Sequence, residues 1–330
     1  MRPPDDRLLF RKRRIGRVFE LACLWAAACG CLVLAALLAS VVWQAWGWLS
    51  WDFLTRYDSR FPEQAGIKAA IWGSFWVLLF TAVVSVPIGV GTAVYLEEFA
   101  RPTWVTRTIQ LNINNLAGVP SIVYGILGLA AFVRMFGLFG PEPTPRTFSI
   151  LGWQVSIPLP LGRTVLAGSL TLALLILPII VLTTQEALRA VPRSIRHAAL
   201  ALGASRWQTV RMQVLPAAAP GILTGVILSL SRAIGETAPL IMIGALTYVA
   251  FTPGGIESVR DLVDFQKLAK VPFSPFTVLP IQIFNWALQP RRAYSHLSAA
   301  GIVVLLCTLL SMNALAIYLR QRFRRRLGST

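Results

Sequence analysis

Long apolar stretches, separated by shorter polar segments, dominate this chain. A helix needs about 20 mostly apolar residues to cross the hydrocarbon core of a membrane, and six stretches reach or approach that length. The fifth is too long for one straight helix, so we expect a break within it. The pattern predicts an all-α membrane protein with six transmembrane helices. They lie at Leu21–Trp43, Ala69–Leu96, Ala117–Phe139, Val165–Thr183, Ala217–Ala250 and Leu297–Leu319.

Prolines modify this pattern. Pro87, Pro178 and Pro239 lie inside predicted helices, and each removes the amide that would bond the carbonyl four residues earlier, so kinks are expected there. A further apolar run, Phe273–Leu288, is short and contains two prolines. We therefore predict that it is a re-entrant or interfacial segment and not a seventh span.

Composition agrees with a membrane location. The chain is 55% hydrophobic and 14% charged, which leaves too little polar surface to coat a soluble globule. The net charge is +17, but the positive residues lie between the apolar runs and form no face suited to nucleic acid. The four cysteines lie inside apolar runs without a CxxC pair. These features exclude a soluble enzyme, a disulfide-stapled secreted domain and a disordered tail.

The distribution of positive charge predicts the orientation. Nineteen of the 31 Lys and Arg residues lie on the same side as the N-terminus, ten lie on the other side and two lie within predicted helices. Cytoplasmic segments carry the excess of positive charge, so both termini are expected in the cytoplasm. Basic tails at 1–20 and 320–330, expected to contact anionic lipid, flank a transmembrane domain at 21–319. That domain has a cytoplasmic loop at about 184–216 and a loop on the opposite side of the membrane at about 251–296.

The loop at 184–216 is predicted to fold as helix, turn and helix. Ser194 can cap a helix that begins at Ile195, Gly203 can end that helix in a left-handed conformation, and Ser205 can cap a second helix. Small residues at 198, 199 and 201 allow another protein's surface to approach closely. We interpret the loop as an exposed docking element.

The spacing of Ala198-Ala199, Gly203 and Leu215-Pro216 resembles the EAA loop of bacterial ABC-transporter permeases. His197 stands where that family usually has Glu, and Gln213 stands where Ile is common. In that family the short helix of the loop fits a cleft on the ATPase subunit. The resemblance therefore implies an ATPase-coupling element made of Glu186, His197, Ala198, Ala199, Gly203, Leu215 and Pro216.

One ion pair is predicted inside the fifth span. Arg232 and Glu236 are four residues apart and can meet on one helical face. A charge at that depth costs about 2.5–3.5 kcal/mol on insertion scales, which indicates that the charged pair has a role in the protein. Small residues recur at every fourth position of this span and permit close helix packing; they are Gly221, Gly225, Ser229, Ala233 and Thr237.

Two interpretations of the pair remain open. Arg232, Glu236 and Thr237 could serve anion passage or gating, or the pair could only neutralise itself and fix helix packing. In both cases we expect the pair to face a packed interface or a water-filled path and not lipid. Arg134, near the outer end of the third span, can simply extend to the membrane surface.

Further motifs closely resemble the permeases of the phosphate-specific (Pst) ABC importer, and the resemblance covers about Gly66 to Arg326. The segment 93–99 (AVYLEEF), the long fifth loop and the ending 313–317 favour the A-type subunit. Leu182 stands where some members carry Arg before the Thr-Thr pair. The resembling motifs are NNLAGVPSIVYG at 114–125, TTQE at 183–186, SRAIGETAPL at 231–240 and MNA at 312–314.

The resemblance implies an inner-membrane subunit with an ABC-importer (MetI-like) permease architecture. Its implied partners are a similar C-type permease, two ATP-binding subunits and a periplasmic phosphate-binding protein. The sequence has no GxxxxGK[ST] phosphate loop, so ATP hydrolysis is expected in a partner. No catalytic residue, cofactor or metal site is expected in this chain. Arginine suits the oxygens of phosphate, but the residues alone leave sulfate and molybdate open.

Two other classes of protein fit the sequence less well. A self-sufficient secondary anion transporter could use Arg232 and Glu236 as a proton relay, but it leaves the docking loop unexplained, and no inverted repeat is detectable. A membrane-embedded enzyme is disfavoured because no His or carboxylate cluster faces a common span. The only two histidines, His197 and His296, lie in predicted loops.

Overall fold

The computed structural model describes residues 6–140, 144–150, 153–245, 248–256, 261 and 263–327. The extreme ends of the two predicted basic tails, 1–5 and 328–330, lie outside these residues. Within them the fold is almost entirely helical, and five helices are long and apolar enough to cross a membrane. They are α1 (Asp6–Ala45), α3 (Lys68–Val94), α6 (Val165–Arg189), α9 (Leu215–Gly235) and α13 (Arg292–Leu327).

The sixth crossing is a bent pair of helices, and the predicted bounds of the third span were wrong. Helix α4 (Trp104–Ala117) ends where that span was expected to begin. After a bend of 105° the chain continues as α5 (Ser121–Gly128) and a π-helical turn, Leu129–Val133. The Tyr124 hydroxyl donates to the Leu116 carbonyl at 2.8 Å and holds the bend closed. Helix α4 is amphipathic, so its hydropathy alone did not reveal it.

The fifth predicted span is broken, as its length required. Helix α9 ends at Gly235, Glu236 has an extended backbone, and α10 (Ala238–Ile243) follows. Pro239 lies in the first turn of α10, where its missing amide costs no helical bond. It therefore begins a new helix and does not kink a continuous one, which corrects the expectation. Pro87 and Pro178 lie inside α3 and α6, as predicted.

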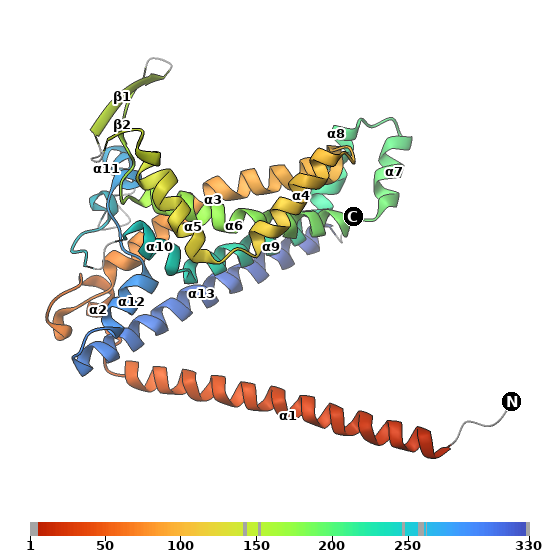
Figure 1. The fold of residues 1–330 in the computed structure, drawn as a ribbon, viewed down its shortest axis with the longest axis horizontal. Helices are drawn as coiled ribbons and strands as arrows, with labels where there is room; N and C mark the ends of the chain where they lie inside the picture. Colours follow the sequence, from red (N-terminus) through yellow and green to blue (C-terminus); the bar gives the residue numbers. More distant parts are fainter. Residues whose placement is uncertain are drawn as a thin grey trace.

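Helix α6 lies at the centre of the bundle. It packs against α3 on one side and α9 on another, and α9 also packs against α13. Ile176, Ile180 and Leu188 of α6 are fully buried. Helix α1 diverges from this bundle and contacts α13 near its own C-terminal end (Figure 1). Nearly all of the apolar surface of α1 is therefore uncovered.

One end of the molecule carries a β-hairpin and several short helices (Figure 1). Strand β1 (Thr144–Ile150) pairs antiparallel with β2 (Trp153–Leu159), with Thr144 opposite Leu159. This hairpin was not predicted, since the sequence between the third and fourth spans was treated as a plain loop. The short helices at this end are α2 (Trp51–Thr55), α11 (Phe265–Lys270) and α12 (Leu279–Ala287).

The segment Phe273–Leu288 does not cross the bundle. Its helix α12 has nine residues, about 13 Å, well short of a membrane. The non-helical segment before α12 lies very close to α3. A Cβ on Gly73 would be 1.9 Å from the Thr277 carbonyl oxygen. Trp286 donates from Nε1 to Asp58 Oδ1 at 2.9 Å. Burial raises the pKa of the Asp58 carboxyl above its ordinary value, and the Trp286 hydrogen bond partly offsets this.

The opposite end carries α7 (Arg193–Ala201) and α8 (Arg206–Thr209). The first turn of α1 and the last turn of α13 lie at this same end (Figure 1). Helix α1 therefore begins, and α13 ends, at the same end of the molecule, as an even number of crossings requires.

Candidate functional site

The segment between α6 and α9 folds as the predicted helix, turn and helix. Gly203 has φ of +84°, the left-handed conformation that ends α7. Ser205 caps α8 in a capping box, in which its hydroxyl accepts from the Gln208 amide and the Gln208 side chain accepts from the Ser205 amide. Ser194 does not cap α7, contrary to expectation. The helix begins at Arg193, two residues before the predicted start and directly after Pro192, which already breaks the preceding helix.

The outer face of α7 is uncovered, and no residue of this helix is buried. His197 and Ala198 are exposed, whereas Ala199 is half-buried against the chain. Leu202, directly after the last turn, is 90% exposed, and Leu200 is 47% exposed. Apolar side chains this exposed beside small ones are typical of a surface that another protein covers.

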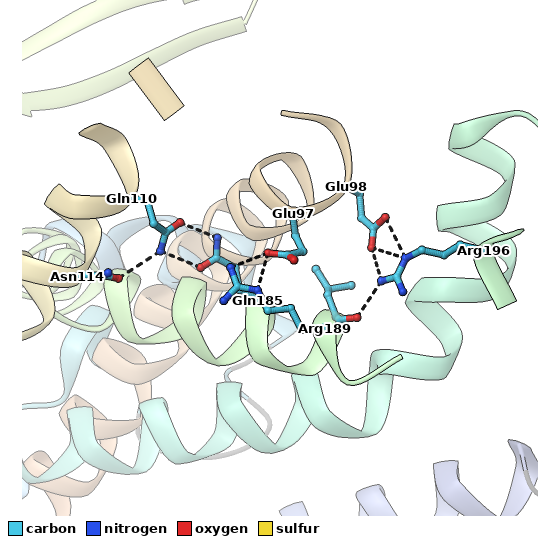
Figure 2. A network of polar contacts seen from close by, with 8 residues as sticks. Glu97, Glu98, Gln110, Asn114, Gln185, Arg189 and Arg196 are labelled. Carbon is cyan, nitrogen blue, oxygen red and sulfur yellow. Dashed lines mark hydrogen bonds and ion pairs between the residues drawn. The ribbon is translucent and has the colours of Figure 1, made fainter. Parts of the chain in front are cut away.

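An ion pair between the half-buried Arg196 and the buried Glu98 holds α7 against the membrane helices (Figure 2). Arg196 donates from Nη2 to Glu98 Oε1 at 2.6 Å, and its Nε donates to the same carboxylate. The two side chains are 20% and 9% exposed. Arg196 also donates to the carbonyl oxygens of Leu188 at 2.9 Å and Val191 at 2.8 Å. One guanidinium thus joins α7 to the end of α6 and to the π-helical turn Tyr95–Phe99 that ends α3.

A more exposed set of contacts flanks this pair (Figure 2). Arg189 donates from Nε to Glu97 Oε2 at 2.9 Å, but the Arg189 side chain is 59% exposed. Gln185 and Gln110 exchange hydrogen bonds at 2.9 and 3.1 Å, which ties α6 to α4. These flanking contacts do not involve α7, which is attached by the Arg196–Glu98 pair and by Ile195, packed against the core.

The remaining residues predicted for coupling are spread along this region. Glu186 is exposed on the last turns of α6. Leu215 and Pro216 are half-buried where α9 begins, and Leu215 packs against the core between α6 and α9. They therefore shape the base of the loop, while the exposed residues of α7 form its tip. The structure brings Gly203, His197 and Ala198 together and leaves Leu215 and Pro216 apart from them.

The small-residue stripe of α9 packs against α6 of the same chain. A Cβ on Gly225 would lie 2.4 Å from Thr183 Oγ1, and one on Gly221 would lie 2.8 Å from Ala187 Cβ. Ser229 and Ala233 are buried in the same interface. Another side of α9 faces α13, where the Ser231 hydroxyl donates to Asn313 Oδ1 at 2.9 Å.

Arg232 lies on the side of α9 that this chain leaves open. It donates from Nε to Glu236 Oε1 at 3.3 Å, and the two side chains are 57% and 17% exposed. The pair meets as predicted, but Glu236 lies just beyond the helix, at the break before α10. Thr237 is half-buried beside it. Arg232 in the last turn of α9 also interacts favourably with the negative end of the helix dipole.

Sequence reasoning missed three features of this region. Glu98 was used only as part of a motif, Arg196 was treated as one more basic loop residue, and Leu202 was not considered. A signal for the pair existed, because two adjacent carboxylates at the end of a span require cationic partners. Within the described ranges no three His, Cys, Asp or Glu side chains gather into a possible metal site.

Six membrane crossings with an exposed helix–turn–helix between the fourth and fifth define the permease subunit of an ABC importer, and the comparisons agree. The sequence matches the family described as "Binding-protein-dependent transport system inner membrane component" over residues 85–327. The chain belongs to this family. It is a permease subunit and not itself an enzyme.

Its relatives include bacterial phosphate permeases. It is 31% identical to the probable ABC transporter permease protein YqgI of Bacillus subtilis over 87% of this chain and 88% of that protein. It is 31% identical to the phosphate transport system permease protein PstA of Haemophilus influenzae over 80% of this chain and 79% of that protein. Identity to PstA of Mycobacterium leprae is 38%, over 58% of each chain.

Solved structures share the fold. A chain of the bacterial alginate ABC transporter, in complex with a periplasmic protein bound to an alginate pentasaccharide, superposes with a TM-score of 0.58 at 16% identity. That match covers 93% of this chain and 97% of the other. A chain of the inward-facing MetNI methionine ABC transporter gives 0.51 at 17% identity, covering 77% and 96%. The all-α permease architecture expected from the sequence is thereby confirmed.

Proposed function

We propose that this chain is the A-type permease subunit of an ATP-driven phosphate importer in the bacterial inner membrane. Its similarity to PstA over most of both chains carries the choice of phosphate. The geometry supports a subunit that works with partners, because its three most distinctive surfaces are open. These are the tip of α7, the length of α1 and the Arg232 side of α9.

The tip of α7 is the proposed contact for an ATP-binding subunit. Leu202 and Leu200 supply exposed apolar area, and Ala198 lets a partner approach the helix closely. The cavity behind the helix, about 620 Å³, is lined by arginines and also by the Glu97 and Glu98 carboxylates. Those carboxylates pair with Arg189 and Arg196, so Arg193 and Arg206 leave a positive rim that favours a partner surface carrying carboxylates.

A second permease of the C type is the proposed cover for α1 and for the open side of α9. Leu228 and Arg232 lie on that side and are 59% and 57% exposed. Because α6 and α13 cover the other sides of α9, a path between two permeases would run past Arg232, Glu236 and Thr237. A periplasmic phosphate-binding protein would deliver the anion to the end that carries the hairpin.

We expect the loop 251–296 to lie in the periplasm and α7 in the cytoplasm, with both termini cytoplasmic. A reporter enzyme that is active only outside the cytoplasm should be active when fused after the exposed Pro290 and inactive when fused after Gly203. The opposite result would invert the topology and remove α7 from reach of an ATPase. A fusion in the more central part of the loop, near Leu262, falls outside the described residues.

Replacing Gly203 with valine should weaken attachment of the ATP-binding subunits. No atom crowds Gly203, so the whole effect comes from its positive φ, which a side chain disfavours by about 1–2 kcal/mol. The measurement is the number of ATP-binding subunits per purified complex. Ala287→Val, on ordinary helical backbone at the exposed end of α12 and at the opposite end of the molecule, should retain them. Full subunit content and normal transport in Gly203→Val would argue against α7 as the contact.

A further inference from the structure

A cavity of about 870 Å³ lies at the hairpin end of the molecule, between the end of α5 and the linker that precedes α6. Among its described lining residues the only charged ones are Arg134 and Arg163. The others are apolar residues and glycines. Within the described part of the chain neither guanidinium has a carboxylate at ion-pair distance. Both side chains are exposed, and two uncompensated positive charges on the wall of one cavity attract an anion.

The fold ties these two arginines together although they are 29 positions apart. Arg134 directly follows the π-helical turn Leu129–Val133. The Gly162 amide donates to the Val133 carbonyl at 3.3 Å, so the residue before Arg163 is bonded to the residue before Arg134. The two side chains therefore belong to one connected piece of backbone.

The turn after Arg134 has an unusual conformation. Met135 and Phe136 have φ of 44° and 53°, a left-handed region that residues with side chains rarely occupy. Conformations of this kind persist when the surrounding structure imposes them, and they cluster at binding sites. Here they sharply redirect the chain at Arg134, beside the cavity.

The cavity also adjoins the proposed path. A Cβ on Gly244, the residue that ends α10, would lie 2.7 Å from Arg163 Nε. The other end of α10 follows directly after Glu236 and Thr237. Six helical residues span about 9 Å, so one short helix separates Arg163 from the break that carries the Arg232 pair. Helix α5 packs on the same helix, since a Cβ on Gly125 would lie 2.7 Å from Pro239 Cα.

We propose that Arg134 and Arg163 bind a phosphate-type oxyanion in this cavity, at the outer end of the path and before it reaches Arg232. The proposal rests on the proposed import function, which supplies the anion. The planar fork of arginine matches tetrahedral oxyanions. The volume is large enough for a hydrated anion, which suits a receiving site more than a tight selectivity site.

The direct test is protection of arginine from chemical modification in the purified complex of this chain with its partner subunits. Phenylglyoxal reacts with exposed guanidinium groups, and mass spectrometry measures the labelling rate of each arginine. In a maltoside detergent, which carries no phosphate, inorganic phosphate should slow labelling of Arg134 and Arg163 several-fold. Chloride at equal ionic strength should not. Arg292, exposed and outside the cavity, should label at the same rate throughout.

A lipid headgroup offers the same chemistry, so the labelling is repeated in phospholipid nanodiscs without added phosphate. Protection in nanodiscs alone would identify the bound oxyanion as a headgroup. Protection by inorganic phosphate in detergent would identify it as the free anion. Unprotected arginines under both conditions would overturn the proposal.

Transport by the same preparation separates this proposal from the proposed function. If the wild-type complex imports phosphate with ATP but phosphate does not slow labelling of the two arginines, only the proposed anion site in the cavity is refuted. If the complex imports no phosphate at all, the proposed import function is refuted. The variant Arg134→Gln/Arg163→Gln should lower uptake several-fold at unchanged complex abundance, and Arg292→Gln should not. If phosphate protects the two arginines in the wild type but the double variant takes up phosphate normally, the cavity lies outside the transport path, which contradicts the proposal.

Discussion

Replacing Arg232 with glutamine should leave an assembled complex that imports little phosphate. Glutamine keeps much of the length of the side chain but removes the positive charge from the open side of α9. The small-residue contacts of α9 with α6 are unchanged. A hydrogen bond to a charged group contributes about 1.5–3 kcal/mol, which corresponds to an uptake loss of about ten- to a hundredfold. The uptake of labelled phosphate per assembled complex measures this loss. The control is Arg211→Gln, which removes another exposed arginine.

The alternative interpretation of the same pair makes the opposite prediction for a double variant. If Arg232 and Glu236 only neutralise each other, each single change leaves one charge without its partner and impairs assembly. The double change Arg232→Gln/Glu236→Gln then restores both assembly and uptake. If Arg232 serves the anion, the double variant assembles but stays inactive. Recovery to near wild-type uptake would therefore defeat the path interpretation.

The second large effect is expected from Glu98→Gln. The Glu98 carboxylate is buried against the half-buried Arg196, and losing hydrogen bonds to a charged group costs about 1.5–3 kcal/mol. Helix α7 should then lose its fixed position relative to α3 and α6. We expect ATP hydrolysis to continue while the phosphate imported per ATP falls several-fold. Purified complex in proteoliposomes gives both rates in one experiment.

Two matched variants separate positioning from simple charge loss. Arg196→Lys keeps the charge but cannot hold Glu98 and the carbonyls of Leu188 and Val191 at once, so it should uncouple as well. Arg189→Gln removes the neighbouring exposed pair with Glu97 and should change import per ATP little. Equal effects of Arg189→Gln and Glu98→Gln would contradict a special role for the buried pair.

The sequence predicted those parts of the fold that depend on local pattern. Apolar runs of spanning length located the long helices, and the excessive length of the run from Ala217 to Ala250 predicted a break, which the structure places at Glu236. Gly203 and Ser205 were correctly assigned because a left-handed end and a capping box each require particular residue types within a few positions. The Arg232–Glu236 contact followed from helical spacing alone.

The features that were missed depend on contacts between distant segments. Glu98 and Arg196 are 98 positions apart, and no periodicity relates them. Helix α4 was not predicted because its buried side is narrow and its polar residues, such as Gln110, form hydrogen bonds with α6. Arg134 and Arg163 line one cavity because a π-helical turn and a linker are joined by one backbone hydrogen bond. Such pairings become visible only in the assembled fold.

The central claim is that this chain provides a phosphate path driven by partner ATPases. Its most direct test is labelled-phosphate uptake into proteoliposomes that contain the purified complex, with the periplasmic binding protein outside and ATP inside. The account predicts that labelled-phosphate uptake requires ATP, the ATP-binding subunits and the binding protein together. An excess of sulfate or molybdate should not inhibit this uptake. Phosphate uptake by this chain alone, driven by a proton gradient without ATP, would contradict it and establish a secondary transporter.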